Sequence, residues 1–140
     1  MKLCLAFFLL AQEVLVGAEW KAERKLPAPE AHQAAASDKD FVYAITSRGV
    51  AKYDRKSGKR VATSQGAAKH LNSGFFWKGK LLCAHSNYPL KPEHSEIKVL
   101  DVGSMKLTTF KDFGSADGSL TWVLHKGGFW WCNFALYGAD

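Results

Sequence analysis

The sequence predicts an antiparallel all-β protein built from repeated units. Short runs rich in β-branched and aromatic residues follow one another after residue 31, and turns containing Gly, Asp, Ser or Lys separate these runs. A spacing of about 8–12 residues between such turns is typical of antiparallel sheets. Helical periodicity is weak over the same region, so the runs favour strands over helices.

The runs recur as a larger unit. In order they read FVYAIT, VAKYD and KRVATS; then FFW, KLLCAHS, EIKVLD and MKLTTF; and finally SLTWVLH and FWWCNFAL. Asp54 and Asp101 end equivalent runs 47 residues apart, and Phe41, Leu81 and Phe129 begin equivalent runs at spacings of 40 and 48. A period of about 40–50 residues with four strands per unit is typical of a β-propeller blade. The sequence therefore predicts about two and a half four-stranded antiparallel blades of an incomplete propeller.

The predicted blades divide the chain into consecutive parts. Residues 32–64 and 70–111 form two blades, and residues 119–140 form part of a third. Residues 19–31 contain two prolines and form a lead-in linker or an extended strand. Because a propeller closes with at least about four blades, we expect this chain to be the N-terminal part of a longer product whose remaining blades are its partners.

Local patterns support the individual strands and turns. The runs FVYAI, LLCA and FWWC are continuously apolar, as expected for strands buried on both faces between neighbouring blades. The segment from Asp54 to Gly58 predicts a tight turn, because Asp accepts backbone hydrogen bonds there and Gly adopts positive φ.

These features resemble a broad group of secreted propellers that includes NHL-type, quinoprotein-like and gluconolactonase-like proteins. The resemblance covers about residues 32–140 and depends on the turn YDRKSGK and on the order of the strands. The segments HSNYP, GSLTW and WWCNFALY are similar to those of uncharacterised bacterial secreted propellers. The resemblance implies a propeller fold; it does not imply one activity, because this fold carries many functions.

The N-terminus predicts export. Lys2 precedes an apolar run that extends to Ala11, and small or modest residues at 16–18 predict cleavage before Glu19, so residues 1–18 form a signal peptide. The alternative is a buried N-terminal helix. The apolar run is shorter than the ~20 residues that cross a bilayer, so no transmembrane segment is expected after cleavage. The predicted location is secreted or periplasmic.

Composition limits the classes of partner. The chain has a formal net charge of +6, and its lysines are spread over predicted turns. This pattern favours a solvated surface, and no nucleic-acid partner is expected. After cleavage Cys83 and Cys132 remain. They lie in equivalent strands of adjacent units, where either a disulfide between blades or two buried free thiols would fit.

The predicted topology gathers polar residues on one face. The connections between blades (residues 64–70 and 112–119) and those between second and third strands (residues 46–49 and 86–95) share this face. Long loops on a rigid scaffold often carry function, and residues 86–95 form the longest one. The candidate ligand-binding residues are His70, Asn72, His85, Asn87, Tyr88 and Asp117. The alternatives are a packing role for His85, a plain turn for Asp117 and a loop insertion without a role.

These residues favour an exported binding or recognition module with a ligand site on this face. A small polar molecule or a carbohydrate would suit it. The alternative is a propeller enzyme, a hydrolase, lactonase or isomerase acting on a small polar or sugar-like substrate with or without a metal. Catalytic residues are not assigned, because the sequence has no recognised catalytic motif. No ligand spacing identifies a metal site or a cofactor. The tryptophans favour packing between blades over stacking on a sugar.

Overall fold

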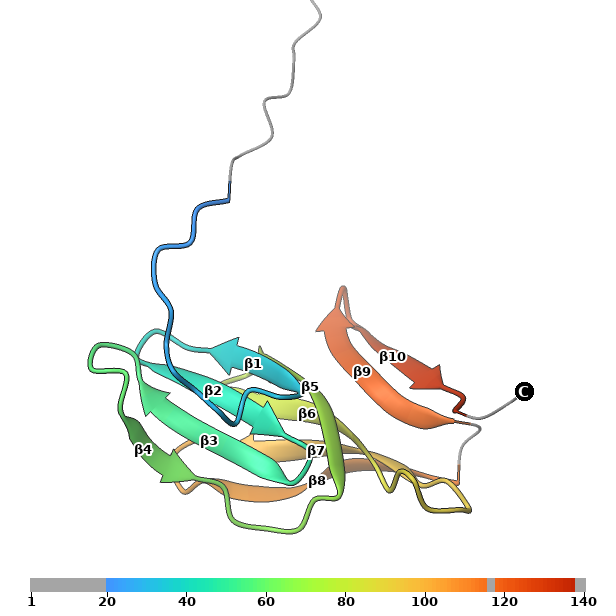
Figure 1. Ribbon diagram of the computed structural model, residues 1–140. Helices are drawn as coiled ribbons and strands as arrows, with labels where there is room; N and C mark the ends of the chain where they lie inside the picture. The colour runs from blue at the N-terminus through green and yellow to red at the C-terminus, as the bar shows by residue number, and fades with distance from the viewer. Residues whose placement is uncertain (1–19, 116–117, 138–140) are drawn as a thin grey trace, which may run out of the picture.

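Ten strands in three antiparallel sheets make up the part of the chain that the computed structural model describes, residues 20–115 and 118–137 (Figure 1). The predicted all-β class is therefore confirmed. The predicted signal peptide, residues 1–18, lies outside the described residues. Within them, no helix is long and apolar enough to cross a membrane.

In each sheet, strands that are consecutive in sequence are neighbours. The first sheet has the order β1-β2-β3-β4, the second β5-β6-β7-β8, and the third consists of β9 and β10. The strands are β1 (Ala34–Ser37), β2 (Phe41–Thr46), β3 (Gly49–Asp54), β4 (Arg60–Thr63), β5 (His70–Trp77), β6 (Lys80–Ser86), β7 (Ser95–Asp101), β8 (Lys106–Gly114), β9 (Ser119–Lys126) and β10 (Phe129–Ala135).

One strand differs from the sequence prediction in a way that matters for the site. Asp112 was expected in the connection before β9, but β8 continues to Gly114 and includes it. The reason is the register: Glu96 on β7 pairs with Asp112 on β8, so the ladder extends past the predicted end.

The second sheet lies in the middle and buries apolar side chains on both faces. Toward the first sheet, a buried cluster includes Tyr43, Ile45 and Leu81. Toward β9 and β10, a second cluster includes Leu82, Leu120 and Val123. This division follows from strand alternation, because Leu81 and Leu82 are adjacent and point to opposite faces.

The two long repeats end their third strands in the same turn. Asp54 Oδ1 accepts hydrogen bonds from the backbone N–H and hydroxyl of Ser57, at 2.7 Å each, and Asp101 Oδ1 accepts the same pair from Ser104 at 2.9 Å each. Gly58 follows Ser57 with a φ of 71°, which is the positive φ expected from the sequence.

The segment before β1 packs on the outer face of the first sheet. Ala28 contacts a buried cluster that contains Ala44, Ala51 and Tyr53. The Tyr53 hydroxyl donates a hydrogen bond to the Glu30 carboxylate, and the Arg24 guanidinium donates to backbone carbonyls of the turn after β3. Residues 24–30 therefore cover this sheet.

The two cysteines are free thiols in different clusters. Cys83 is buried between the first and second sheets, and Cys132 packs against the cluster between the second and third sheets. A disulfide between them, one of the two alternatives, is therefore not formed. Burial raises the pKa of Cys83 to about 12, so its thiol stays protonated.

Candidate functional site

An open pocket of about 510 Å³ lies at the end of the sheets where β6 runs into its loop with β7. The connection between β4 and β5, the loop 87–94, the first half of β7 and the start of the connection after β8 form its wall. Its lining residues are Ala67, Ala68, Lys69, His85, Asn87, Leu90, Lys91, Pro92, His94, Glu96, Lys98 and Ser115.

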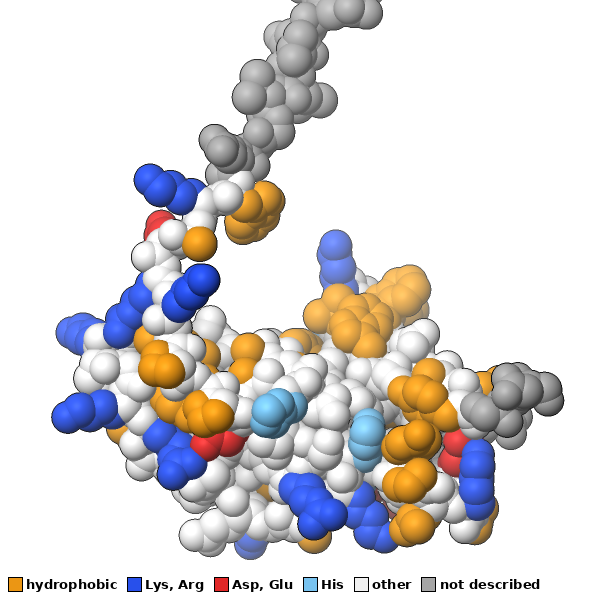
Figure 2. Space-filling model, in the orientation of Figure 1, with side chains coloured by type: hydrophobic (Ala, Val, Ile, Leu, Met, Phe, Trp, Pro, Cys, Tyr) orange, Lys and Arg blue, Asp and Glu red, His pale blue; other side chains and the backbone are white. Residues whose placement is uncertain are grey.

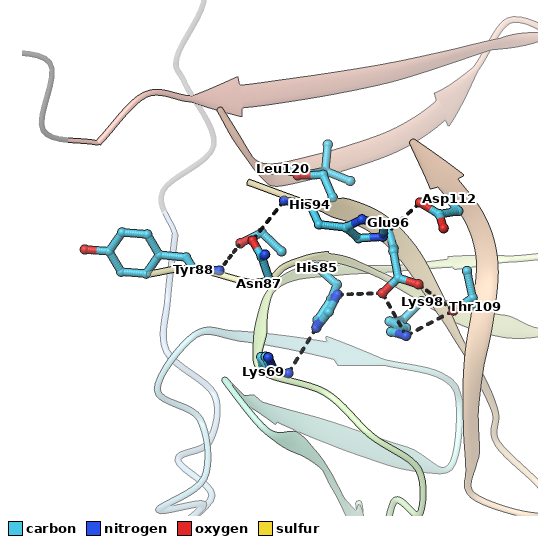
Figure 3. A network of polar contacts seen from close by, with 12 residues as sticks. Lys69, His85, Asn87, Tyr88, His94, Glu96, Lys98, Thr109, Asp112 and Leu120 are labelled. Carbon is cyan, nitrogen blue, oxygen red and sulfur yellow. Dashed lines mark hydrogen bonds and ion pairs between the residues drawn. The ribbon is translucent and has the colours of Figure 1, made fainter. Parts of the chain in front are cut away.

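His85 forms the inner wall of this pocket and is only 6% exposed. Its Nε2 accepts a hydrogen bond from the backbone N–H of Lys69 at 3.0 Å, so the neutral ring carries its proton on Nδ1. Nδ1 points toward Glu96 Oε2, 3.0 Å away (Figure 3). Burial lowers the pKa of His85 to about 4, and the nearby Lys98 charge adds to this effect. His85 is therefore neutral at pH 7.

Glu96 is the centre of a largely buried polar network. Lys98 Nζ lies 2.9 Å from Glu96 Oε2, and the Thr109 hydroxyl donates a 2.7 Å hydrogen bond to Glu96 Oε1. Burial opposes ionisation of Glu96, but the hydrogen bonds from Lys98 and Thr109 outweigh it and hold the pKa of Glu96 below its ordinary value. The carboxylate is therefore charged at pH 7.

His94 lies at the outer edge of the same network. Its Nε2 is 3.0 Å from Asp112 Oδ1, and both side chains are about half exposed to solvent. A donor atom of His94, a carboxylate oxygen of Glu96 and a carboxylate oxygen of Asp112 all lie within 4.8 Å of one another. Figure 3 shows these three side chains converging from β7, its preceding loop and β8.

Asn87 shapes the loop that carries His94. Its side-chain carbonyl accepts a hydrogen bond from the His94 N–H at 2.9 Å, and its amide group donates to the Pro92 carbonyl at 2.9 Å. The backbone N–H of Asn87 also donates to the His94 carbonyl at 2.9 Å. Because its polar atoms are used within the loop, Asn87 positions the pocket wall.

The other predicted site residues lie beside this pocket or away from it. His70 contacts the Tyr88 ring edge-on, with ring centroids 5.2 Å apart, and Tyr88 lines a neighbouring pocket of about 360 Å³. Asn72 points to β9 and donates a hydrogen bond to the Leu120 carbonyl at 3.1 Å, which joins two sheets. Asp117 lies outside the described residues.

Sequence reasoning did not single out Glu96, Lys98 or Asp112. Glu96 and Lys98 lie on one face of β7, and His94 continues the same two-residue spacing one position before the strand begins. This spacing is a signal that can be read from sequence. The contribution of Asp112 depends on the register between β7 and β8, which the sequence pattern does not fix.

Comparisons with known proteins add little to this description. No family model matches the sequence, and no curated protein matches it. Among solved structures, the crystal structure of the computationally designed Ika4 protein is similar over 79% of this chain and 89% of that chain, with 12% sequence identity and a TM-score of 0.46. These values carry no inference about family or function.

Proposed function

We propose that this chain is an exported binding module with propeller-type sheets, and that its pocket receives a small polar ligand. The observation that carries the proposal is the pocket of about 510 Å³, which has polar and charged walls and lies where the long loop meets two connections between sheets. Its volume suits a small molecule such as a monosaccharide derivative.

The propeller part of the proposal draws on the order of the sheets. Two four-stranded meanders and a hairpin follow one another along the chain, and β5 contacts both β1 and β9, the first strands of the neighbouring sheets. In a propeller the first strands of successive blades are neighbours around the axis. Export draws on the N-terminal sequence, because Lys2, the apolar run and residues 16–18 have the order of a signal peptide.

The charges of the pocket favour an acidic ligand. Lys69, Lys91 and Lys98 line it, against one acidic lining residue, Glu96. Lys98 is paired with Glu96, and Lys91 Nζ lies 2.7 Å from Glu93 Oε1, so Lys69 is the lysine best placed to meet a carboxylate. A sugar acid or another small carboxylate fits this arrangement better than a neutral sugar.

Binding is favoured over catalysis by the state of His85. His85 Nε2 accepts a hydrogen bond from the backbone N–H of Lys69, and His85 Nδ1 points at the Glu96 carboxylate. Neither nitrogen is therefore directed at a bound molecule. A general base needs a nitrogen within hydrogen-bond reach of its substrate. His85 therefore supports the wall of a binding site.

The proposal is tested by thermal shift with glucuronate and galacturonate, and with glucose and galactose as neutral controls. We expect the acids, at millimolar concentration, to raise the melting temperature and the neutral sugars at the same concentration to leave it unchanged, because a ligand that binds the folded state stabilises it. Lys69→Met should abolish the shift, and Lys56→Met, in the turn after β3, should retain it. Absence of any shift, or an equal shift in both variants, would contradict the proposal.

A further inference from the structure

Three potential metal ligands converge at the outer edge of the pocket. A ring nitrogen of His94, a Glu96 oxygen and an Asp112 oxygen lie within 4.8 Å of one another, and His94 Nε2 is 3.0 Å from Asp112 Oδ1. Donors bound to one tetrahedral zinc ion, at about 2.0–2.2 Å each, lie slightly more than 3 Å apart. Small side-chain rotations would therefore place an ion between these three atoms.

The fold holds these side chains together from several directions. Glu96 and Asp112 are cross-strand partners on β7 and β8, so their side chains emerge on the same face. His94 precedes Glu96 by two residues, and Asn87 anchors its backbone through two hydrogen bonds. The pairing of β7 with β8 and the loop 87–94 therefore hold the three side chains close together.

A second observation points to an incompletely satisfied centre at the same place. His85 is 94% buried, and its Nδ1 has no well-formed hydrogen bond although it is directed at Glu96 (Figure 3). Buried polar atoms without a partner are rare and require an explanation. If the Glu96 carboxylate rotated toward an ion, the His85 Nδ1–H could donate a hydrogen bond to that carboxylate. Side chains that hydrogen-bond to metal ligands commonly orient them in this way.

We propose that His94, Glu96 and Asp112 bind one divalent transition-metal ion, with Zn²⁺ as the best match. One imidazole nitrogen and two carboxylate oxygens form a donor set that suits zinc better than calcium or magnesium, which prefer oxygen alone. The fourth position would face the pocket and take water or a ligand atom. This proposal does not depend on sugar-acid binding, because the ion should bind to the chain alone.

Lys98 gives the proposal a distinctive consequence. Its ammonium group lies 2.9 Å from Glu96 Oε2 and donates a hydrogen bond to Thr109, so it holds the carboxylate that the ion would use. An ion beside Glu96 must displace this positive charge or bind against its repulsion. Removing the charge should therefore strengthen metal binding.

The test is calorimetric titration of the full chain with zinc chloride at pH 7.5, supported by Co²⁺ absorption spectra. We expect one ion per chain. His94→Gln and Asp112→Asn should each weaken binding at least about tenfold, and Lys98→Met should tighten it. His32→Gln, at an exposed histidine outside this cluster, should bind like the parent chain.

The experiment separates loss of zinc binding from misfolding of a variant, and failure of the zinc proposal from failure of the proposed function. His94 and Asp112 are about half exposed, so their substitutions should leave the melting curve in the absence of zinc unchanged, and that curve is recorded for each variant. Unchanged zinc affinity in folded His94→Gln, or no binding by the parent chain, would overturn the proposal. Loss of the glucuronate shift with retained zinc binding would contradict only the proposed function.

Discussion

The two faces of the middle sheet, β5–β8, are packed in different ways. Toward the first sheet, Ile45, Leu81 and their neighbours are fully buried, and Gly74 lets the layers come so close that a Cβ there would lie 2.4 Å from Ile45 Cδ1. Toward the β9–β10 hairpin, Leu120 and Val123 are buried, but the aromatic residues around them are only partly covered.

Polar contacts supplement packing on both sides. Toward the first sheet, the Lys52 ammonium group donates a hydrogen bond to the Val102 carbonyl at 2.8 Å, and the Leu71 N–H donates to the Ser47 carbonyl at 2.9 Å. Asn72 and Ser73, at the bulge in β5, contact the backbone of β9, and the buried Ser95 hydroxyl accepts a hydrogen bond from the Leu120 N–H at 3.0 Å. A two-stranded ribbon buries less apolar area than a four-stranded sheet. The comparison indicates that side-chain hydrogen bonds contribute a larger share of the attachment of the hairpin than of the first interface.

The outer face of the hairpin sharpens this contrast. Trp122 and Trp131 are 44% and 56% exposed, and Figure 2 shows hydrophobic side chains gathered over the upper end of the hairpin. The outer face of the first sheet is covered by residues 24–30, as Ala28 and Glu30 show. Within the described residues, the hairpin has no such cover.

The largest expected effect comes from truncating the two interfaces at matched leucines. Leu81→Ala should lower the free energy of unfolding by about 3–5 kcal/mol, because the cavity lies between two full sheets that cannot close around it. Leu120→Ala should cost about 2–3 kcal/mol, because the hairpin can move inward. Urea denaturation measures both, and an equal or reversed order would contradict the comparison.

Much of this fold could be predicted because its signals are local. The run FVYAIT has the apolar content of a buried strand, and β2 occupies the same residues. The turn after Asp54 was also predictable, since Asp, Ser and Gly each have a defined role in it. The apolar run FWWC predicted burial on both faces, yet Phe129 is 69% exposed, because composition does not show whether a covering layer is present.

The candidate site could be predicted only in outline. The long loop directed attention to His85 and Asn87, and both line the pocket. Charged residues within a strand, such as Glu96 and Lys98, read as a solvated face in the sequence. Their burial depends on how the loop 87–94 and the neighbouring strand fold over them, which strand patterns do not encode. The ligand-binding roles of the candidate residues named from the sequence stay predictions.

The buried His85, at the end of the middle sheet that carries the loop 87–94, predicts that the free energy of unfolding depends on pH. His85 has a pKa of about 4 in the folded chain against an ordinary value near 6.5, so the unfolded chain binds more protons between these values. The stability from keeping His85 neutral is complete above pH 6.5 and is lost as the pH falls toward 4. Urea denaturation at pH 7 and pH 5 should show a smaller difference in His85→Gln than in the parent chain. An unchanged difference would contradict burial of a neutral ring.

A smaller effect is expected at the polar contacts of the second interface. Asn72→Ala removes the hydrogen bond to the Leu120 carbonyl and should cost about 1 kcal/mol. Ser73→Ala removes a longer contact, 3.3 Å from the Val123 N–H, and should cost less. Thermal or urea denaturation would test this order. A larger cost for Ser73→Ala would show that the bulge is held differently.

The smallest effect on stability, with a clear effect on association, is expected on the outer face of the hairpin. Trp131 is 56% exposed on β10, an edge strand of the two-stranded third sheet, and an apolar edge strand invites pairing with other chains. Trp131→Lys should change the free energy of unfolding by no more than about 0.5 kcal/mol. It should also raise the monomer fraction in sedimentation velocity over a range of concentrations.

Trp20→Lys is the matched control: it makes the same chemical change at a tryptophan that is 98% exposed and far along the chain from the hairpin. If both variants reduce association equally, added charge is the cause, and the open face of β9–β10 is not the surface that associates.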